Sequence, residues 1–307
     1  MQLFLEATMK AYAKEILISS LALLILLAAV WGYIRSTKIQ QSNTRIDIYT
    51  VIPPDANALV AVNRPSVFNR MLLENQALYD IFVSQIPPLF LSFVRESRFL
   101  QSVTFSFHPQ GVICYVQAGD EWESAVKKKL ESHFSAYKPV KTKADGIAFY
   151  YYPDAGSRFL GCFTHKGVWV GSYSKKLLEK VAGQQVNPAV SFPGDMKRLR
   201  YSFDANAPLN IIFPTKDLNL YVSSARGTPG WRITDRWLAA DLFLSEGNIC
   251  CYGFLPYEPD KPLAMYQSMG DTISARIRNL YAPVRLSFQV NREGAWAYYT
   301  GCAPAGK

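Results

Sequence analysis

Apolar and polar positions follow two periods along most of the chain, and these predict short strands joined in hairpins with amphipathic helices between them. The stretch "SVTFSFHPQGVICYVQ" alternates on both sides of a turn at residues 108–111, which predicts a hairpin with one buried face. After it, apolar residues recur every four positions at Trp122, Val126, Leu130 and Phe134. That spacing predicts an amphipathic helix.

The same order of hairpin and helix returns further along the chain. "SRFLGCFTHKGVWVGS" predicts a hairpin that turns at residues 165–167, and "YSKKLLEKVAG" predicts a helix that ends at Gly183. Two more hairpins are predicted in "WLAADLFLSEGNICCYGF" and "VRLSFQVNREGAWAYYTG". Ahead of all four, the pattern predicts a strand over 58–62 and helices over 67–73, 77–84 and 88–95. Together these elements predict an α+β fold with an antiparallel sheet.

One segment follows neither period. Residues 16–34, "ILISSLALLILLAAVWGYI", carry no charge, and as a helix they would be about 28 Å long, close to the thickness of a bilayer core. A buried core helix is disfavoured because the run is apolar around its whole circumference. A cleaved signal peptide is disfavoured because the run is long and ends without a small-x-small site. We therefore expect a retained transmembrane signal anchor, whose residues include Ile16, Leu27, Trp31, Tyr33 and Ile34.

The charges that flank this segment do not choose its orientation. Lys10 and Lys14 on one side are matched by Arg35 and Lys38 on the other. An N-terminal anchor ahead of a large domain most often leaves that domain outside the cytoplasm. We expect a single-pass protein of the bacterial inner membrane that contacts the bilayer through residues 16–34 and has a periplasmic C-terminal domain.

The predicted organisation has five parts. They are a short N-terminal segment over 1–15, the anchor over 16–34, a polar tether over 35–50, a first hairpin-helix half over 51–186 and a second hairpin half over 187–307. The boundary between the halves is placed at "NPAVSFPGD", which is rich in proline and small residues. Alternatively, the two halves share one sheet.

Composition narrows the class of protein. Hydrophobic residues make up 49% of the chain and aromatic residues 14%, which excludes a disordered chain. The net charge is +9, but the basic residues are scattered and no nucleic-acid-binding motif is present. We expect no nucleic-acid partner.

Candidate chemistry is sparse. Cys250 and Cys251 are adjacent in a predicted strand, so their side chains point to opposite faces and cannot share a metal. The five cysteines, Cys114, Cys162, Cys250, Cys251 and Cys302, all lie in apolar strand sequence. They are expected to pack as small hydrophobes, and a disulfide between neighbouring hairpins stays open. The histidines lack the spacing of a zinc site, and no phosphate-binding glycine loop occurs, so we expect no metal and no cofactor.

Ser174 and Asp241 are polar residues with a possible place in catalysis or binding. Ser174 has Ser-x-x-Lys spacing but directly precedes a helix, so a helix cap is favoured. Asp241 interrupts the apolar run "WLAADLFL" and is a weak candidate for an exposed acid on a ligand-binding face; the alternative is the polar side of a strand. No catalytic residue is identified.

The order of anchor, "IPPDANALVAVN", hydrophobic hairpin, "GVWVGSYSKKLLEKV" and "WLAADLFLSEGNICCYGF" resembles single-pass envelope proteins of bacteria that carry a domain of unknown function. The resemblance covers about residues 50–255 and implies an envelope location, without catalytic residues to carry over.

Three functions compete at this point. The leading one is a membrane-anchored, non-enzymatic, extracytoplasmic protein that binds or scaffolds an envelope protein, lipid or glycan. The second is an envelope hydrolase with an unrecognised carboxylate site. The third is a carrier or chaperone for lipid or apolar peptide, in which the aromatic strands "IAFYYYP" and "AWAYYTG" line a groove.

Overall fold

The computed structural model divides the chain into two compact units, Met1–Arg45 and Ile46–Lys307. All the described residues lie in the second unit. The residues that the structure describes are 47–96, 100–118, 122–186, 199, 203–204, 206–214, 221–222, 231–232, 237–245, 248–256, 287–291 and 296–304.

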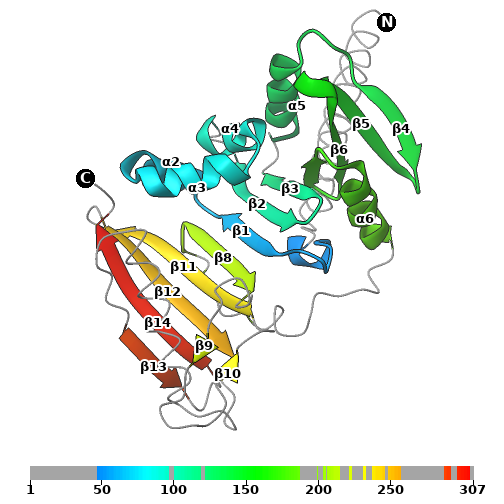
Figure 1. Cartoon of the computed structure of the whole chain (residues 1–307). Coiled ribbons are helices and arrows are strands. Elements are labelled where there is room, and N and C mark those ends of the chain that lie inside the picture. The colour runs from blue at the N-terminus through cyan, green and yellow to red at the C-terminus, as the bar shows by residue number, and fades with distance from the viewer. Residues whose placement is uncertain are drawn as a thin grey trace, which may run out of the picture. The chain divides into compact units, whose positions relative to one another are not determined.

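Fourteen strands and several short helices make up the described chain (Figure 1). The strands are β1 (Ala58–Val62), β2 (Leu100–His108), β3 (Gly111–Ala118), β4 (Val140–Ala144), β5 (Ile147–Asp154), β6 (Arg158–His165), β7 (Val168–Ser172), β8 (Leu209–Pro214), β9 (Tyr221–Val222), β10 (Trp231–Arg232), β11 (Trp237–Ser245), β12 (Asn248–Pro256), β13 (Ser287–Asn291) and β14 (Trp296–Pro304). The helices are η1 (Ile48–Thr50), α2 (Pro65–Glu74), α3 (Gln76–Gln85), α4 (Pro88–Glu96), α5 (Trp122–His133), η2 (Ala155–Ser157) and α6 (Lys175–Val186).

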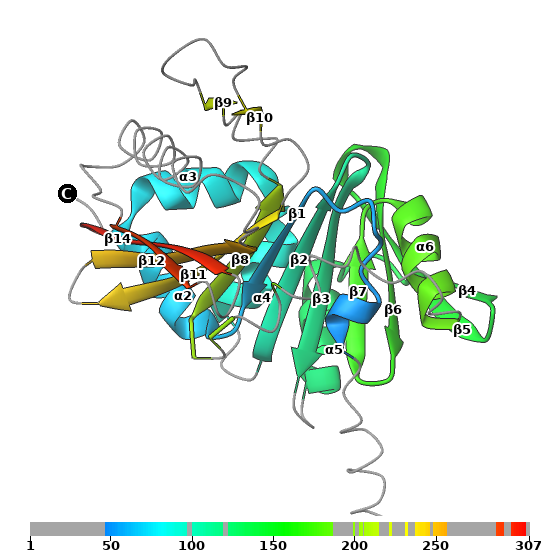
Figure 2. The ribbon, with the colours of Figure 1, turned by 90° about the horizontal axis from the view of Figure 1, so that it is seen from below.

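Twelve of the strands form one sheet in the order β13-β14-β12-β11-β8-β1-β2-β3-β7-β6-β5-β4, and each neighbouring pair is antiparallel. The strand β1 lies between β2 and β8 (Figure 2), with Val60 opposite Phe105 on one side and Ile211 on the other. Strands from early and late in the sequence therefore meet in the middle of the sheet.

The predicted fold class, α+β with an N-terminal transmembrane helix, is wrong. One antiparallel sheet of 12 strands dominates the described residues, and the helices are few and short. Within the part of the chain that the structure describes, no helix has the length and apolar character needed to cross a membrane. The membrane and single-pass assignments thus have no support in this structure. The predicted anchor, residues 16–34 with Ile16, Leu27, Trp31, Tyr33 and Ile34, lies outside the described residues, as does the predicted boundary at 187–195.

The two faces of the sheet carry separate hydrophobic clusters, because successive side chains of a strand point to opposite faces. On β3, Cys114 and Val116 join the cluster that includes residues of α2, α4 and α5. Ile113 and Tyr115 of the same strand join the cluster that contains residues of η1 and α6. Helices α5 and α6 consequently lie on opposite faces of β5, β6 and β7 (Figure 1).

Most of the predicted hairpins and helices are confirmed as local elements, with two notable differences. The helix α6 does not end at Gly183 but continues to Val186. A hairpin between β4 and β5 was missed, although its turn holds Asp145 and Gly146, both with positive φ (50° and 80°). An Asp-Gly pair is a strong signal for this turn.

Candidate functional site

A cavity of about 500 Å³ lies between α5 and the sheet. The helix supplies Val126 and Leu130, spaced so that they share one face, and Phe134 follows in the next turn. Tyr150 and Tyr152 come from β5, where alternate residues face the same side. Because these contributions come from separate elements, only the fold assembles the cavity.

The inner wall of the cavity is aromatic. Phe134 stacks on Tyr152 with ring centroids 5.0 Å apart. Trp169 of β7 also lines the cavity, and its indole is supported from behind by Phe93 of α4 at 5.2 Å. Such ring pairs contribute about 0.5–1.5 kcal/mol beyond the apolar area that they bury. The wall is therefore held in place without any ligand.

Polar groups of the inner wall are neutral. Burial raises the pKa of Cys162 to about 12, partly offset by a hydrogen bond with the Trp169 side chain. Burial also raises the pKa of Tyr152 to about 12, with smaller contributions from Cys162, Glu131 and Tyr150. The thiol and the phenol thus stay protonated at neutral pH, and neither acts as a nucleophile there.

The rim of the cavity is exposed and charged. Tyr137 is 62% exposed and lies beside Lys138, so the cavity opens to solvent on this side. Lys127 and Glu131 lie on the same edge and form an ion pair, with Nζ and Oε1 3.8 Å apart. Lys141 of β4 places its ammonium 5.6 Å from the ring centroid of Tyr150.

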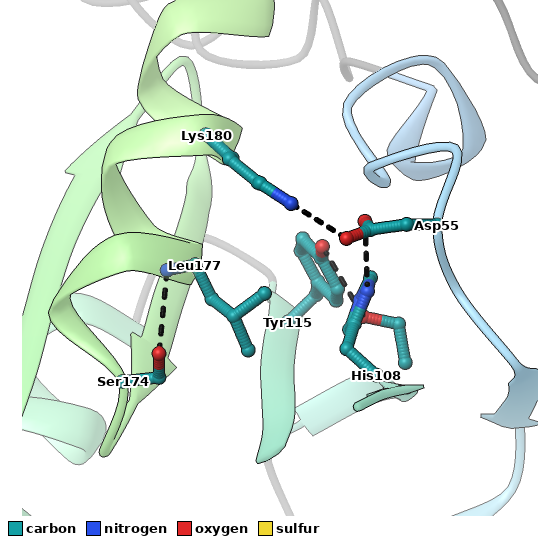
Figure 3. Close-up of polar contacts among 7 residues, drawn as sticks. Asp55, His108, Tyr115, Ser174, Leu177 and Lys180 are labelled. Carbon is teal, nitrogen blue, oxygen red and sulfur yellow. Dashed lines mark hydrogen bonds and ion pairs between the residues drawn. The ribbon is translucent and has the colours of Figure 1, made fainter. Parts of the chain in front are cut away.

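A second polar site lies on the face of the sheet that α6 covers, where Tyr115 is buried. Figure 3 shows its polar contacts. His108 Nδ1 is 3.2 Å from Asp55 Oδ1, and His108 Nε2 is 2.8 Å from Ser106 Oγ. The connectivity is that of an Asp-His-Ser catalytic triad. Lys180 of α6 donates to the other oxygen of Asp55 at 2.6 Å, and Tyr115 lies 3.4 Å from Ser106.

Electrostatics at this second site keep Asp55 charged and His108 neutral. Burial raises the pKa of Asp55. The hydrogen bond from Lys180 and the electrostatic effects of His108 and Lys180 outweigh burial, so the pKa of Asp55 is lowered. Burial lowers the pKa of His108, and the carboxylate of Asp55 offsets only part of that effect. A neutral imidazole could accept a proton, as a general base does.

The serine of this site is nevertheless sealed. Ser106 and Tyr115 have no exposed surface, and the described cavity is lined by other residues. A nucleophile must come within about 3–3.5 Å of the atom it attacks, which a closed site does not permit. The hydrogen bonds that join Ser106, His108 and Asp55 therefore hold the turn at 53–56 against the sheet. The bond from Lys180 to Asp55 connects helix α6 to the same turn.

Comparisons with known proteins identify no family. No family model matches the chain, and no curated protein matches it in sequence. Among solved structures, crystal form I of TP0453 is similar with a TM-score of 0.49 and 13% identity, covering 85% of this chain and 94% of that one. Crystal form III of TP0453 has a TM-score of 0.45 and 12% identity, covering 86% and 96%.

Asp241 of β11 is buried, and its carboxylate is hydrogen-bonded within the protein. Its side chain accepts hydrogen bonds from the Asp204 backbone N–H at 2.9 Å and from Asn210 Nδ2 at 2.6 Å, and the residue is 4% exposed. Burial raises its pKa to about 6, against the two hydrogen bonds that lower it. The carboxylate is therefore not an exposed acid, and it lies apart from the cavity.

Ser174 and the cysteines have local structural roles. Ser174 Oγ accepts from the Leu177 backbone N–H at 3.4 Å, which confirms the predicted helix cap (Figure 3). Cys250 forms a disulfide with Cys302, directly across from it on β14, while Cys251 on the next position is a free thiol. Among the described residues, no group of three or more His, Cys, Asp and Glu side chains is placed to hold a metal ion.

Sequence reasoning found one part of the cavity and missed the rest. "IAFYYYP" contains Tyr150 and Tyr152, which do line it, whereas "AWAYYTG" lies in β14 with Tyr299 buried in the sheet. The missed residues were those of α5, the segment that follows it, β6 and β7. For α5 the signal was the row Val126, Leu130 and Phe134, but that row by itself indicates only a buried helix face.

Proposed function

We propose that this protein is a non-enzymatic binding protein whose ligand is a small, largely apolar molecule held in the cavity between α5 and the sheet. The cavity is the observation that carries the proposal. Its volume of about 500 Å³ lies within the ~300–1,000 Å³ typical of small-molecule sites. An apolar wall with a few polar groups at the opening is also typical of such sites.

Two observations favour binding over hydrolysis. Ser106 has triad-like partners but no exposed surface, so it offers no route to a substrate. Asp241, the candidate for an exposed acid on a ligand-binding face, is buried and accepts hydrogen bonds from the Asp204 backbone N–H and the Asn210 side chain. The cavity, in contrast, is open to solvent, and the polar groups of its inner wall, Tyr152 and Cys162, are neutral, which suits an apolar ligand.

The disulfide supports a place outside the cytoplasm. Cys250 and Cys302 lie on neighbouring strands, and Cys302 is exposed to solvent. Exposed structural disulfides persist mainly in oxidising compartments. Acid-quenched cells followed by alkylation and mass spectrometry should show Cys250 and Cys302 linked and the other three cysteines alkylated; five alkylated thiols would remove this support.

The binding proposal is tested by titrating the full chain with N-phenylnaphthylamine, a neutral apolar probe that fluoresces when it leaves water. We expect one saturable site per chain. Leu130→Trp fills the cavity and should weaken binding by at least about tenfold, since a lost 1.4 kcal/mol is a tenfold change. Lys128→Trp is the matched control, because Lys128 is exposed on the same helix and does not line the cavity.

Folding of each variant is checked by thermal unfolding. If Leu130→Trp fails to fold, Thr164→Trp provides the same block from an exposed position in the lining. Absence of saturable binding, or equal binding by both Trp variants and the parent chain, would reject the cavity as the ligand site.

A further inference from the structure

Positive charge gathers at the opening of the cavity. Lys127 and Lys138 are part of its lining, and the one acidic side chain among the described lining residues is Glu131. Glu131 is already paired with Lys127. The lining therefore carries one uncompensated positive charge.

Lys138 supplies that charge. Within the described part of the chain, no carboxylate forms an ion pair with Lys138. Its side chain is exposed and lies next to Tyr137 at the rim, with a flexible stem that can turn toward the opening. Lys141 adds a second ammonium close to the rim, over the ring of Tyr150.

The interior differs sharply from the rim. Leu130, Phe134 and Trp169 are almost fully buried, and the phenol and thiol at the wall, Tyr152 and Cys162, are neutral. A charged group placed among these side chains would lose its hydration without a partner. Any charge on the ligand must therefore stay at the rim, within reach of the lysines.

From this division we infer that the ligand is an amphiphilic anion, with its apolar body among Phe134, Tyr152 and Trp169 and its anionic group bound at the opening by Lys138, with Lys141 close by. This inference rests on the proposed binding function and names its ligand class. The chemistry required of the ligand is one anionic headgroup on an apolar body. A carboxylate and a phosphate monoester both meet this requirement.

Displacement of N-phenylnaphthylamine tests the inference with four ligands that share a twelve-carbon chain: dodecanoate, dodecyl phosphate, dodecanol and dodecyltrimethylammonium. The charged ligands are used below the concentrations at which they form micelles, and dodecanol is used below its solubility limit. Because exposed ion pairs are weak, each lysine is expected to contribute about three- to fivefold in affinity. Dodecanoate should bind about tenfold more tightly than dodecanol, and the cation should bind most weakly. The ratio of dodecanoate to dodecyl phosphate affinities assigns the headgroup.

Charge variants locate the effect. Lys138→Gln should lower dodecanoate affinity about three- to fivefold and leave dodecanol unchanged, whereas Lys128→Gln on the outer side of α5 should change neither. Glu131→Gln removes the competing carboxylate and should raise dodecanoate affinity. A gain of affinity is a result that damage to the fold would not produce.

The failures are distinguishable. If the neutral probe does not bind, the proposed function fails. If the probe and dodecanol bind but dodecanoate has no advantage, the proposed function stands and this inference is overturned. The inference is also overturned if Lys128→Gln costs as much as Lys138→Gln, because the general positive field of α5 then explains the preference.

Discussion

The two helices that cover β5, β6 and β7 differ in how closely they approach the sheet. On α6, Leu177, Leu178 and Val181 have no exposed surface and pack directly on the strands. On the other face, α5 leaves a cavity of about 500 Å³ beneath it. The same three strands therefore carry a closed face and an open one.

The width of the apolar stripe accounts for the difference. Residues 177, 178, 181 and 182 of α6 are buried, so two adjacent rows face the sheet. In the described side chains of α5 a single row is buried, Val126 and Leu130, continued by Phe134. A helix needs an apolar stripe about 100° wide to lie flat on a core. A narrow stripe leaves space beside it, and the cavity under α5 occupies that space.

The largest contrast is expected from removing one leucine on each face. Leu178→Ala should cost about 3–5 kcal/mol of unfolding free energy, because the deletion leaves an empty space inside packed core. Leu130→Ala should cost about 2 kcal/mol, because it enlarges a cavity that already opens to water. Urea unfolding of both variants measures the two costs, and equal costs would show that the α5 face is as tightly packed as the α6 face.

Substitutions at two glycines, one on each face, test the same difference in packing and are expected to have effects of intermediate size. A methyl group added at Gly161 would meet Leu178 and, at 2.9 Å, the ring of Tyr151, so Gly161→Ala should cost about 1–3 kcal/mol. A methyl group at Gly171 would meet the ring of Trp169, which has the cavity to move into. Gly171→Ala should therefore cost less stability but weaken probe binding.

Thermal unfolding and probe titration of both glycine variants separate these effects. For Gly161→Ala we expect a lower melting temperature and an unchanged probe affinity. For Gly171→Ala we expect a smaller change in melting temperature and a weaker probe affinity. If Gly161→Ala lost probe affinity while Gly171→Ala kept it, the probe would not bind on the α5 face of the sheet.

The smallest effect is expected from pH, and it belongs to the α6 face. The pKa of His108 is lowered in the folded protein below its usual 6.5, so the unfolded chain binds the proton first as the pH falls. Its contribution to stability is complete above pH 6.5 and is lost as the pH drops through the lowered pKa. Asp55 partly offsets the effect of burial, which keeps the change modest.

His108→Gln should remove this part of the pH dependence in urea unfolding between pH 5 and 8. Asp241 has the opposite sign: its pKa is raised from 3.8 to about 6, so its contribution falls as the pH rises between those values. Since Asp241 is present in both chains, subtracting the two pH profiles removes its contribution and leaves that of His108 together with its partner Asp55. Parallel profiles would mean that His108 does not titrate differently in the folded state.

Local structure was predictable because the information is local. The alternation around Phe105 and Cys114 predicts a hairpin, and the structure pairs those two residues directly. The Asp145-Gly146 turn shows that even the missed hairpin had a signal in its two turn residues. The prediction of the fold class was wrong because hydrophobic alternation within each hairpin does not indicate that separate hairpins pair edge to edge in one sheet.

The sites were less predictable, for a physical reason. Asp55 and His108 are joined through the fold, and Lys180 reaches them from a helix 125 residues away from Asp55. Nothing in the spacing of these residues predicts that contact. The cavity depends on how far α5 stands from the sheet, a distance set by the helices and strands together. The Cys250–Cys302 pairing likewise follows from the neighbouring positions of β12 and β14, which the sequence left open.

The position of β1 has a consequence for the order of folding. The Asn63 side chain, just after β1, donates a hydrogen bond to Asn210, 147 residues away, whereas β1 and β2 are joined by a much shorter connection that holds α2, α3 and α4. Closing the longer loop costs more chain entropy, and contacts between distant residues slow folding. During synthesis the first seven strands emerge before β8, so the free edge of β1 stays unpaired until the later strands arrive. An unpaired edge is a template for association with other chains, so we expect the growing protein to be prone to aggregation until β8 pairs with β1.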